Sequence, residues 1–223
     1  CSSDLSVGAT ENIILAAVKA KGTTVIRNAA REPEIIDLQN YLNNAGAKIK
    51  GSGNSVIIIE GVEKLKNVNH NTMPDRIVAG TFMVASAITK GEIIIKNVVV
   101  DHLQSINAKL KEAGCSIYTD EKSLKIIGPK KIYPIEMTQT LPYPGFPTDM
   151  QAQLMALLSI ASGTSIITET VFENRFKHAE ELIRMGANIK TFGKVAVIKG
   201  VKELTGAKTT AKDLRGGACL VLA

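Results

Sequence analysis

The stretch Ile160-Ala161-Ser162-Gly163-Thr164-Ser165-Ile166-Ile167 joins the end of an apolar helical pattern to a strand rich in β-branched residues. The same change of pattern recurs at Gly22 and Gly91, so the three glycines lie 69 and 72 residues apart. A second marker, a helix-ending glycine before a strand, repeats at intervals of 68 and 72 residues at Gly46, Gly114 and Gly186. Repeats of this length are supersecondary modules. We therefore predict three copies of one module, followed by the first helix of a fourth at residues 214–223.

Each copy is predicted to contain a helix, a strand, a second helix and a hairpin, which makes the fold class α/β. In the third copy the strand is expected at residues 164–168 and the hairpin at 187–191 and 195–199. The predicted buried face of its first helix is Met150, Leu154, Leu157, Leu158 and Ala161, and that of its second helix is Phe176, Ala179 and Ile183. Because each copy carries more than one apolar face, the copies should pack on one another around shared helices.

The composition is that of an ordinary soluble globular protein, with 45% hydrophobic and 22% charged residues. A net charge of +6 favours anionic ligands, whereas an aromatic content of 4% without Trp disfavours nucleic-acid binding by stacking. Cys1, Cys115 and Cys219 have no spacing typical of a zinc site or a disulfide framework, so a reducing, cytoplasmic setting is expected. The apolar runs are too short for membrane insertion. Since the sequence has no leader and does not begin with Met, we interpret it as an internal piece of a longer protein.

A domain boundary is predicted in the polar stretch His70-Asn71-Thr72-Met73-Pro74-Asp75, where Pro74 interrupts any continuing element. This divides the chain into residues 1–73 and 74–223. The histidines His70, His102 and His178 lie in different copies without metal-ligand spacing, so solvated or capping roles are expected for them.

Two loops in the first copy leave structural and functional roles open. The segment Leu5–Thr10 precedes a helix, and it either caps that helix or uses the free amides at the helix start to bind an anion. The segment Arg27–Glu34 places two cations and two acids between a strand and a helix. Its acids could simply complement the helix dipole.

Two further loops carry more distinctive side chains. Three prolines and a glycine in residues 141–149 stiffen the backbone and present Asp149 at a helix start, as a cap, a general base or a ligand of a sugar hydroxyl. Asp213-Leu214-Arg215 occupies the equivalent place in the fourth copy, where Arg215 could clamp a phosphate or carboxylate, or form a surface ion pair. The residues alone indicate an anion-binding repeat protein with acidic and Arg side chains on its loops.

Five segments together resemble the UDP-N-acetylglucosamine enolpyruvyltransferase (1-carboxyvinyltransferase) family, which belongs with the 5-enolpyruvylshikimate-3-phosphate synthases. They are, in order along the chain, Ser6–Asn12, Asn28–Ile35, Phe146–Gln153, Thr168–Phe176 and Asp213–Arg215. The resemblance implies two inside-out α/β barrels, each of three modules with helices inside and strands outside. Residues 1–73 would be the last module of the first domain. Residues 74–223 would be two modules of the second domain and the start of its third.

The resemblance also implies an activity, without metal or cofactor. The family transfers the enolpyruvyl group of phosphoenolpyruvate to the 3-hydroxyl of UDP-N-acetylglucosamine and releases phosphate. This is the first committed step of bacterial peptidoglycan synthesis, on which cell shape and division depend. The family's catalytic Cys and one phosphate-binding Arg match no position in this chain, so the isolated chain is expected to be inactive.

Site residues follow from the same resemblance, position by position. The implied catalytic residues are Asp149, at the sugar hydroxyl, and Asp213, which would assist proton transfer. The implied substrate-binding residues are Ser6, Val7, Gly8 and Val171 along the nucleotide sugar, and Arg175 and Arg215 at phosphoenolpyruvate. Two alternatives are a transfer to shikimate 3-phosphate, and a non-catalytic nucleotide-sugar sensor or scaffold.

Overall fold

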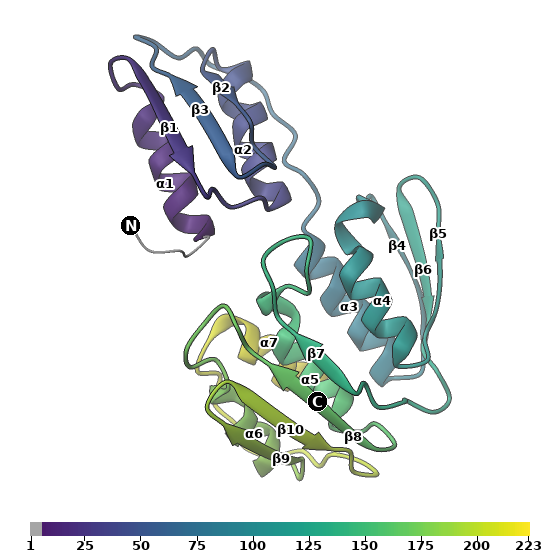
Figure 1. The fold of residues 1–223 in the computed structure, drawn as a ribbon. Coiled ribbons are helices and arrows are strands. Elements are labelled where there is room, and N and C mark those ends of the chain that lie inside the picture. The colour runs from purple at the N-terminus through teal and green to yellow at the C-terminus, as the bar shows by residue number, and fades with distance from the viewer. Residues whose placement is uncertain (1–5) are drawn as a thin grey trace. The chain divides into compact units, whose positions relative to one another are not determined.

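A computed structural model describes residues 6–223, which form two compact units (Figure 1). The first unit extends to Met73 and includes Pro142–Pro144. The second consists of Pro74–Leu141 and Gly145–Ala223. The correspondence of these units to the two predicted domains of a longer protein stays a prediction. Cys1 lies outside the described residues.

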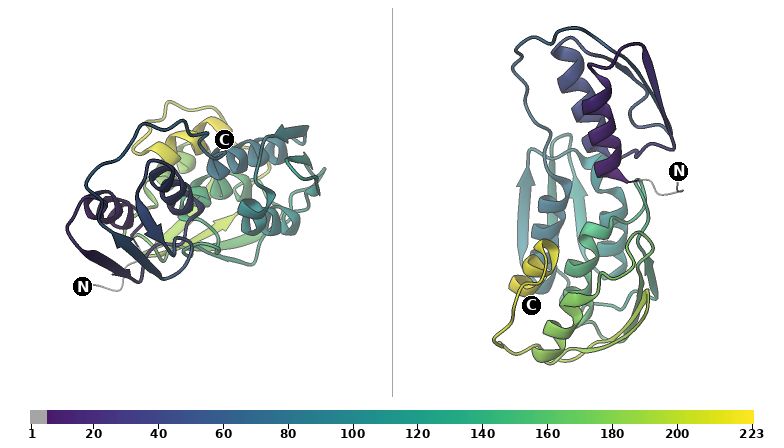
Figure 2. Two further views of the ribbon diagram at one scale, coloured as in Figure 1. Left: turned by 90° about the horizontal axis from the view of Figure 1, so that it is seen from above. Right: turned by 90° about the vertical axis from the view of Figure 1, so that its left-hand side faces the viewer.

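The first unit contains one copy of the predicted module. Its elements are α1 (Val7–Ala17), β1 (Thr23–Arg27), α2 (Pro33–Asn44), β2 (Lys48–Lys50) and β3 (Val56–Glu60). The strands form an antiparallel sheet in the order β1-β3-β2, and both helices cover the same face of it (Figures 1 and 2). Ile14 of α1, Ile35 of α2, and Ile57 and Ile59 of β3 are fully buried between these layers.

The second unit contains two further copies and one additional helix. The elements of the second copy are α3 (Arg76–Ile88), β4 (Glu92–Lys96), η1 (Val100–Leu103), α4 (Gln104–Glu112), β5 (Ser116–Thr119) and β6 (Ser123–Ile127). The connecting strand β7 (Met137–Gln139) comes next. The third copy then contains η2 (Thr148–Met150), α5 (Gln151–Leu158), β8 (Thr164–Thr168), α6 (Lys177–Arg184), β9 (Asn188–Phe192) and β10 (Val195–Lys199), and the additional helix is α7 (Leu214–Leu222).

Two sheets form the strand layers of the second unit, in the orders β4-β6-β5 and β7-β8-β10-β9. All the strand pairs in them are antiparallel except β7 with β8, which are parallel. The predicted strand at 164–168 and the hairpin after it are confirmed, with the first hairpin strand at Asn188–Phe192. The strand β7 was not predicted, because three residues, Met-Thr-Gln, carry too little pattern to identify.

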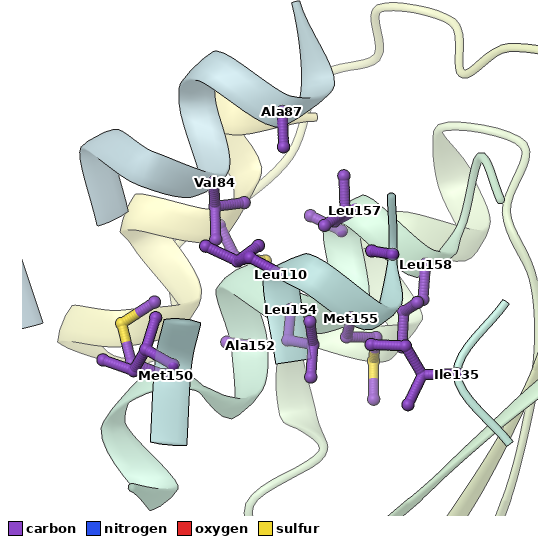
Figure 3. Close-up of a cluster of buried hydrophobic side chains, with 14 of the residues drawn as sticks. Val84, Ala87, Leu110, Ile135, Met150, Ala152, Leu154, Met155, Leu157 and Leu158 are labelled. Carbon is purple, nitrogen blue, oxygen red and sulfur yellow. The ribbon is translucent and has the colours of Figure 1, made fainter. Parts of the chain in front are cut away.

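The helices α3, α5 and α7, which begin successive copies, pack against one another (Figure 3). Val84 of α3 and Leu154 and Leu157 of α5 belong to this shared core. The residues predicted to form the buried face of this helix are all buried, but burial is not limited to that face, because every residue of α5 from Gln151 to Leu158 is buried. The helix is enclosed by α3, α7, β8 and β10, so even its two glutamines are removed from solvent.

Two predictions about burial are wrong. Ile183 of α6 is 46% exposed, and the buried face of that helix instead contains Ala179 and Leu182. Phe176, which lies just before the helix, and Ala179 are buried as predicted. His178 is 2% exposed and therefore not solvated, while the His70 ring bonds the Asp37 carboxylate at 3.1 Å.

Each module is closed by a glycine after its last strand. Gly61, Gly128 and Gly200 donate their N–H groups to the carbonyls of Gly22, Gly91 and Gly163 at 2.9, 2.8 and 2.8 Å. At Gly200, a Cβ would lie 1.6 Å from the carbonyl oxygen of Ala161 at the end of the preceding helix segment. Only glycine, which has no Cβ, therefore fits at position 200, where the end of β10 lies against the end of the helix segment.

Candidate anion-binding site

Asp149 lies in the short helix η2, directly after the proline-rich segment and before α5. Pro147 fixes the approach, and its carbonyl accepts the N–H of Met150 at 2.9 Å. Neither η2 nor α5 has a side-chain cap, so the carboxylate of Asp149 does not serve as one. The capping alternative is thus wrong, and the side chain has other partners.

Two arginines from different modules converge on the Asp149 carboxylate. Arg175, on the loop after β8, donates from Nη2 to Oδ1 at 2.5 Å. Arg215, in the first turn of α7, donates from Nη2 to Oδ2 at 3.1 Å. The structure therefore brings Asp149, Arg175 and Arg215 together within the second unit.

These side chains line an open pocket of about 360 Å³. Its lining residues are Asp149, Phe172, Asn174, Arg175, Lys177, Lys212, Asp213, Leu214 and Arg215. Four of them carry a positive charge and two a negative charge, so the pocket has a net positive lining. Such a surface suits a small anion with more than one charged group.

The pKa of Asp149 reflects opposing influences. Burial alone would raise it, but the hydrogen bond from Arg175 and the charges of Arg175 and Arg215 outweigh burial, so the pKa lies below its usual value. The carboxylate is consequently ionised and weakly basic while both arginines hold it. Its basicity depends on where the two guanidinium groups point.

Asp213 has a structural role as well as a position in the pocket. Its Oδ1 accepts the N–H of Gly216 at 2.7 Å, which caps α7 and fixes the turn that presents Arg215. A Cβ on Gly216 would lie 2.9 Å from Oδ2 of Asp213, so the glycine leaves room for this carboxylate.

The other predicted site residues do not line this pocket. Ser6 accepts the N–H of Ala9 at 3.2 Å and caps α1, so the capping interpretation of that segment is confirmed. Val7 and Gly8 form the first turn of α1 in the first unit. Val171 is 41% exposed and follows β8, outside the pocket lining.

The loop Arg27–Glu34 shows mainly structural features. Glu34 lies in the first turn of α2, as expected for an acid at the positive end of a helix. Burial, with Glu34 and Glu32 nearby, raises the pKa of Glu11.

Several pocket residues were missed by sequence reasoning. The Phe172 ring covers the Arg175 guanidinium at 4.6 Å, a cation–π contact that the loop sequence does not reveal. Lys212 pairs with Glu180 at 2.6 Å, and its position directly before Asp213 was the one available signal. Lys177, Asn174 and Leu214 complete the unpredicted lining.

Cys115 and Cys219 are free thiols and are buried, as is usual for small core residues. Burial raises their pKa values to about 11 and about 12, so neither thiol is poised as a nucleophile. Among the described residues, no His, Cys, Asp and Glu side chains cluster as metal ligands would. Within residues 6–223, no helix has the length and apolar character needed to cross a membrane.

Comparison with known proteins identifies the class to which this fold and site belong. The family model of EPSP synthase (3-phosphoshikimate 1-carboxyvinyltransferase) matches residues 2–223. The chain therefore belongs to the EPSP synthase family, and the family membership expected from the five segments is confirmed.

Its similar relatives share a more particular name. The chain is 58% identical over 218 residues to UDP-N-acetylglucosamine 1-carboxyvinyltransferase 2 of Caldanaerobacter subterraneus, and 60% identical to carboxyvinyltransferase 1 of the same organism. Each match covers 98% of this chain and 52% of the relative, so the chain spans about half the length of these relatives.

A solved structure shares the fold. The enolpyruvyl transferase NikO from Streptomyces tendae matches 97% of this chain and 52% of its own chain, with a TM-score of 0.84 and 24% sequence identity. The predicted α/β enolpyruvyl transferase fold is thereby confirmed.

Proposed function

We propose that the full-length protein containing this chain transfers the enolpyruvyl group of phosphoenolpyruvate to the 3-hydroxyl of UDP-N-acetylglucosamine and releases phosphate. The names of the relatives at 58% and 60% identity support this activity. The observation that carries the proposal is the Asp149 carboxylate held by Arg175 and Arg215 in a positively charged pocket. A base and two anion-binding groups are thus next to each other.

The chemistry requires these groups in different roles. Phosphoenolpyruvate carries a carboxylate and a phosphate, which planar guanidinium groups bind through paired hydrogen bonds. As the anion enters, it competes with Asp149 for Arg175 and Arg215. Loss of these donors raises the pKa of Asp149, so the carboxylate becomes a better base when the second substrate is present.

The remaining roles rest on the resemblance of the segments. Asp213 assists proton transfer to the methylene carbon, next to Arg215 in the pocket lining. Ser6, Val7 and Gly8 contact the nucleotide sugar through their backbone, together with Val171. In this proposal residues 1–73 are the last module of the first domain, and 74–223 belong to the second.

The proposed reaction is the first committed step of peptidoglycan synthesis, and it supports bacterial cell shape and division. A cytoplasmic location is part of the proposal, because Cys115 and Cys219 are unpaired thiols, as expected in a reducing compartment. No cofactor or metal is required by the groups assigned here.

A second candidate is transfer to shikimate 3-phosphate, the reaction named in the description of the matching family model. Both reactions use phosphoenolpyruvate, so the pocket around Asp149 fits either. The relatives are named as UDP-N-acetylglucosamine transferases, and this favours the nucleotide sugar as acceptor. A non-catalytic sensor is disfavoured, because the relatives at 58% and 60% identity are named as transferases.

The proposal is tested with the full-length protein, in the wild type and with Asp149→Ala. We expect the substitution to lower turnover by about 10²- to 10⁴-fold, the usual contribution of a general base. Asp120→Ala, an exposed aspartate in the β5–β6 turn, is the matched control and should keep wild-type turnover. Calorimetric titration with UDP-N-acetylglucosamine runs in parallel. Equal affinity together with equal turnover in Asp149→Ala would remove this residue from the mechanism.

A further inference from the structure

Glu169 is a buried carboxylate that is linked through the Thr148 hydroxyl to Arg175 in the pocket lining. It directly follows β8, is 1% exposed, and does not line the anion pocket. A carboxylate removed from solvent is costly unless hydrogen bonds replace its hydration. The hydrogen-bond partners of Glu169 therefore identify the segments that this carboxylate fixes relative to one another.

Both oxygens of Glu169 accept hydrogen bonds. Oε1 accepts the Thr140 hydroxyl at 2.9 Å and the backbone N–H groups of Val171 and Phe172 at 2.9 and 3.1 Å. Oε2 accepts the Thr148 hydroxyl at 2.8 Å. One side chain thus ties the end of β8 to the segment that carries Asp149 and to the loop that carries Arg175.

The bond to Thr148 continues to Arg175. Nη1 of Arg175 donates to the Thr148 hydroxyl oxygen at 2.8 Å, and that hydroxyl donates its proton to Glu169. An arginine can only donate and an ionised carboxylate can only accept, so the direction of both bonds is fixed. Hydrogen bonds in such a chain polarise one another, which strengthens the hold of Thr148 on the guanidinium.

A second support of Arg175 depends on the same carboxylate. The Phe172 ring covers the guanidinium at 4.6 Å, and the Phe172 N–H is bonded to Glu169. The guanidinium is thus fixed at Nη1 and on one face by groups that Glu169 orders. Its Nη2 is directed at Asp149.

We propose that Glu169 is a positioning residue that orients Arg175 toward the anion pocket through Thr148 and Phe172. This inference rests on the proposed function, in which Arg175 contacts the phosphoenolpyruvate anion. Glu169 itself touches no reacting group. Its carboxylate keeps one guanidinium aligned while the substrate displaces Asp149 from it.

The test uses Glu169→Gln in the full-length protein. The amide oxygen must stay at Oε1 to accept two backbone N–H groups, so the amide NH₂ faces Thr148 and reverses the polarity of that bond. We expect kcat/KM for phosphoenolpyruvate to fall roughly tenfold to a hundredfold, the range for loss of a hydrogen bond to a charged group. Thr148→Val should show a similar loss, and Thr148→Ser, which retains the hydroxyl, should stay close to wild type.

Thr140→Val is the matched control. It removes the hydrogen bond to Oε1 of Glu169 and the one that the Thr170 N–H donates to the Thr140 hydroxyl, but it leaves the bonds from Arg175 to Thr148 and from Thr148 to Oε2 in place. It should therefore lower thermal stability with a much smaller loss of kcat/KM. The double variant Glu169→Gln/Thr148→Val should be little worse than either single one, because both interrupt one chain of bonds. Wild-type kcat/KM in Glu169→Gln, additive losses in the double variant, or an equal loss in Thr140→Val would overturn the inference.

Crystal structures of the full-length wild type and Glu169→Gln separate this inference from the proposed function. If the wild type has no transferase activity, the proposed function fails, but the position of Arg175 can still be observed. We expect its guanidinium to lose the bond to Thr148 and to move from Asp149 in the variant. An unmoved Arg175 would contradict the positioning role, whatever the activity.

Discussion

At the scale of single residues, the two arginines set the proton affinity of Asp149. Because their hydrogen bonds and charges outweigh burial, the pKa lies below its usual value. A depressed carboxylate pKa adds stability above the ordinary pKa of an aspartate, and this is lost as the pH falls through the folded value. At a side-chain exposure of 38%, this stabilisation is small because solvent screens the charges.

Arg215→Gln should raise the pKa of Asp149, because one of the charges that lowers it is removed. The shift can be measured by following the Asp149 carboxyl carbon by NMR as a function of pH. Lys212→Gln is the control, since Lys212 lines the same pocket but pairs with Glu180. An Asp149 pKa that is the same in Arg215→Gln and the wild type would show that Arg215 does not control this carboxylate.

His178 provides a second prediction at this scale. Burial, only partly opposed by Asp213, lowers its pKa from 6.5 to about 4. In the unfolded chain the His178 ring therefore binds a proton near pH 6.5, whereas in the folded chain it binds one only near pH 4. Stability should fall as the pH drops from about 6.5 to about 4, by up to about 3 kcal/mol.

The His178 ring protons, followed by NMR in the 223-residue chain, should not titrate until about pH 4. His178→Phe should reduce the loss of stability between pH 6.5 and pH 4, as measured by urea denaturation. Titration of the His178 ring near pH 6.5 would mean that the side chain is solvated after all.

The site residues were predictable to different degrees. Asp149, Arg175, Asp213 and Arg215 could be named because each lies in a distinctive segment that resembles a known family. Glu169 also lies in one of these segments, Thr168–Phe176, but it was given no role, because it begins a polar stretch that looks like an exposed loop. Its burial comes from strand pairing and from two threonines distant in sequence, which no local pattern contains.

At the scale of the elements, the repeat predicted the order of helices and strands but not the surroundings of each helix. The pattern of α5 suggested one buried face, because Gln151 and Gln153 interrupt its apolar residues. Burial of the whole helix requires neighbours on every side, which only the packing of α3, α5 and α7 supplies. Single-helix periodicity cannot report that arrangement.

The closing glycines lead to a prediction about the modules. In Gly200→Ala, the new Cβ would lie 1.6 Å from the Ala161 carbonyl oxygen, so the last strand and the helix end must move apart. We expect a loss of about 1–3 kcal/mol in the free energy of unfolding, or more, as for other overpacked sites. Urea denaturation of the 223-residue chain measures this loss.

Gly206→Ala is the control, because no atom lies within 4 Å of a Cβ built at Gly206. Its stability should stay within about 0.5 kcal/mol of the wild type. If both alanine variants unfold at the same urea concentration, the contact between strand end and helix end is not needed to close the module.

At the scale of the whole molecule, the sequence provides about half the length of its named relatives. The second unit contains the positively charged pocket, while Ser6, Val7 and Gly8 belong to the first. The α/β class and the modules were predictable, because repetition makes each copy evidence for the others. The acceptor substrate was predictable only through resemblance, since many acceptors can satisfy one aspartate and two arginines.

The isolated 223-residue chain is expected to release no phosphate from phosphoenolpyruvate when UDP-N-acetylglucosamine is present. The resemblance places a catalytic Cys and a phosphate-binding Arg outside it, and the buried Cys115 and Cys219 cannot replace the former. The full-length protein assayed under the same conditions is the positive control. Product formed by the chain alone would show that the pocket around Asp149 is sufficient for catalysis.

Phosphate release by the full-length protein, measured with phosphoenolpyruvate and either UDP-N-acetylglucosamine or shikimate 3-phosphate, tests the proposed function most directly. We predict release with the nucleotide sugar and none above background with shikimate 3-phosphate. Release with shikimate 3-phosphate alone, or no release with either acceptor, would contradict the assignment of this chain to a UDP-N-acetylglucosamine enolpyruvyl transfer.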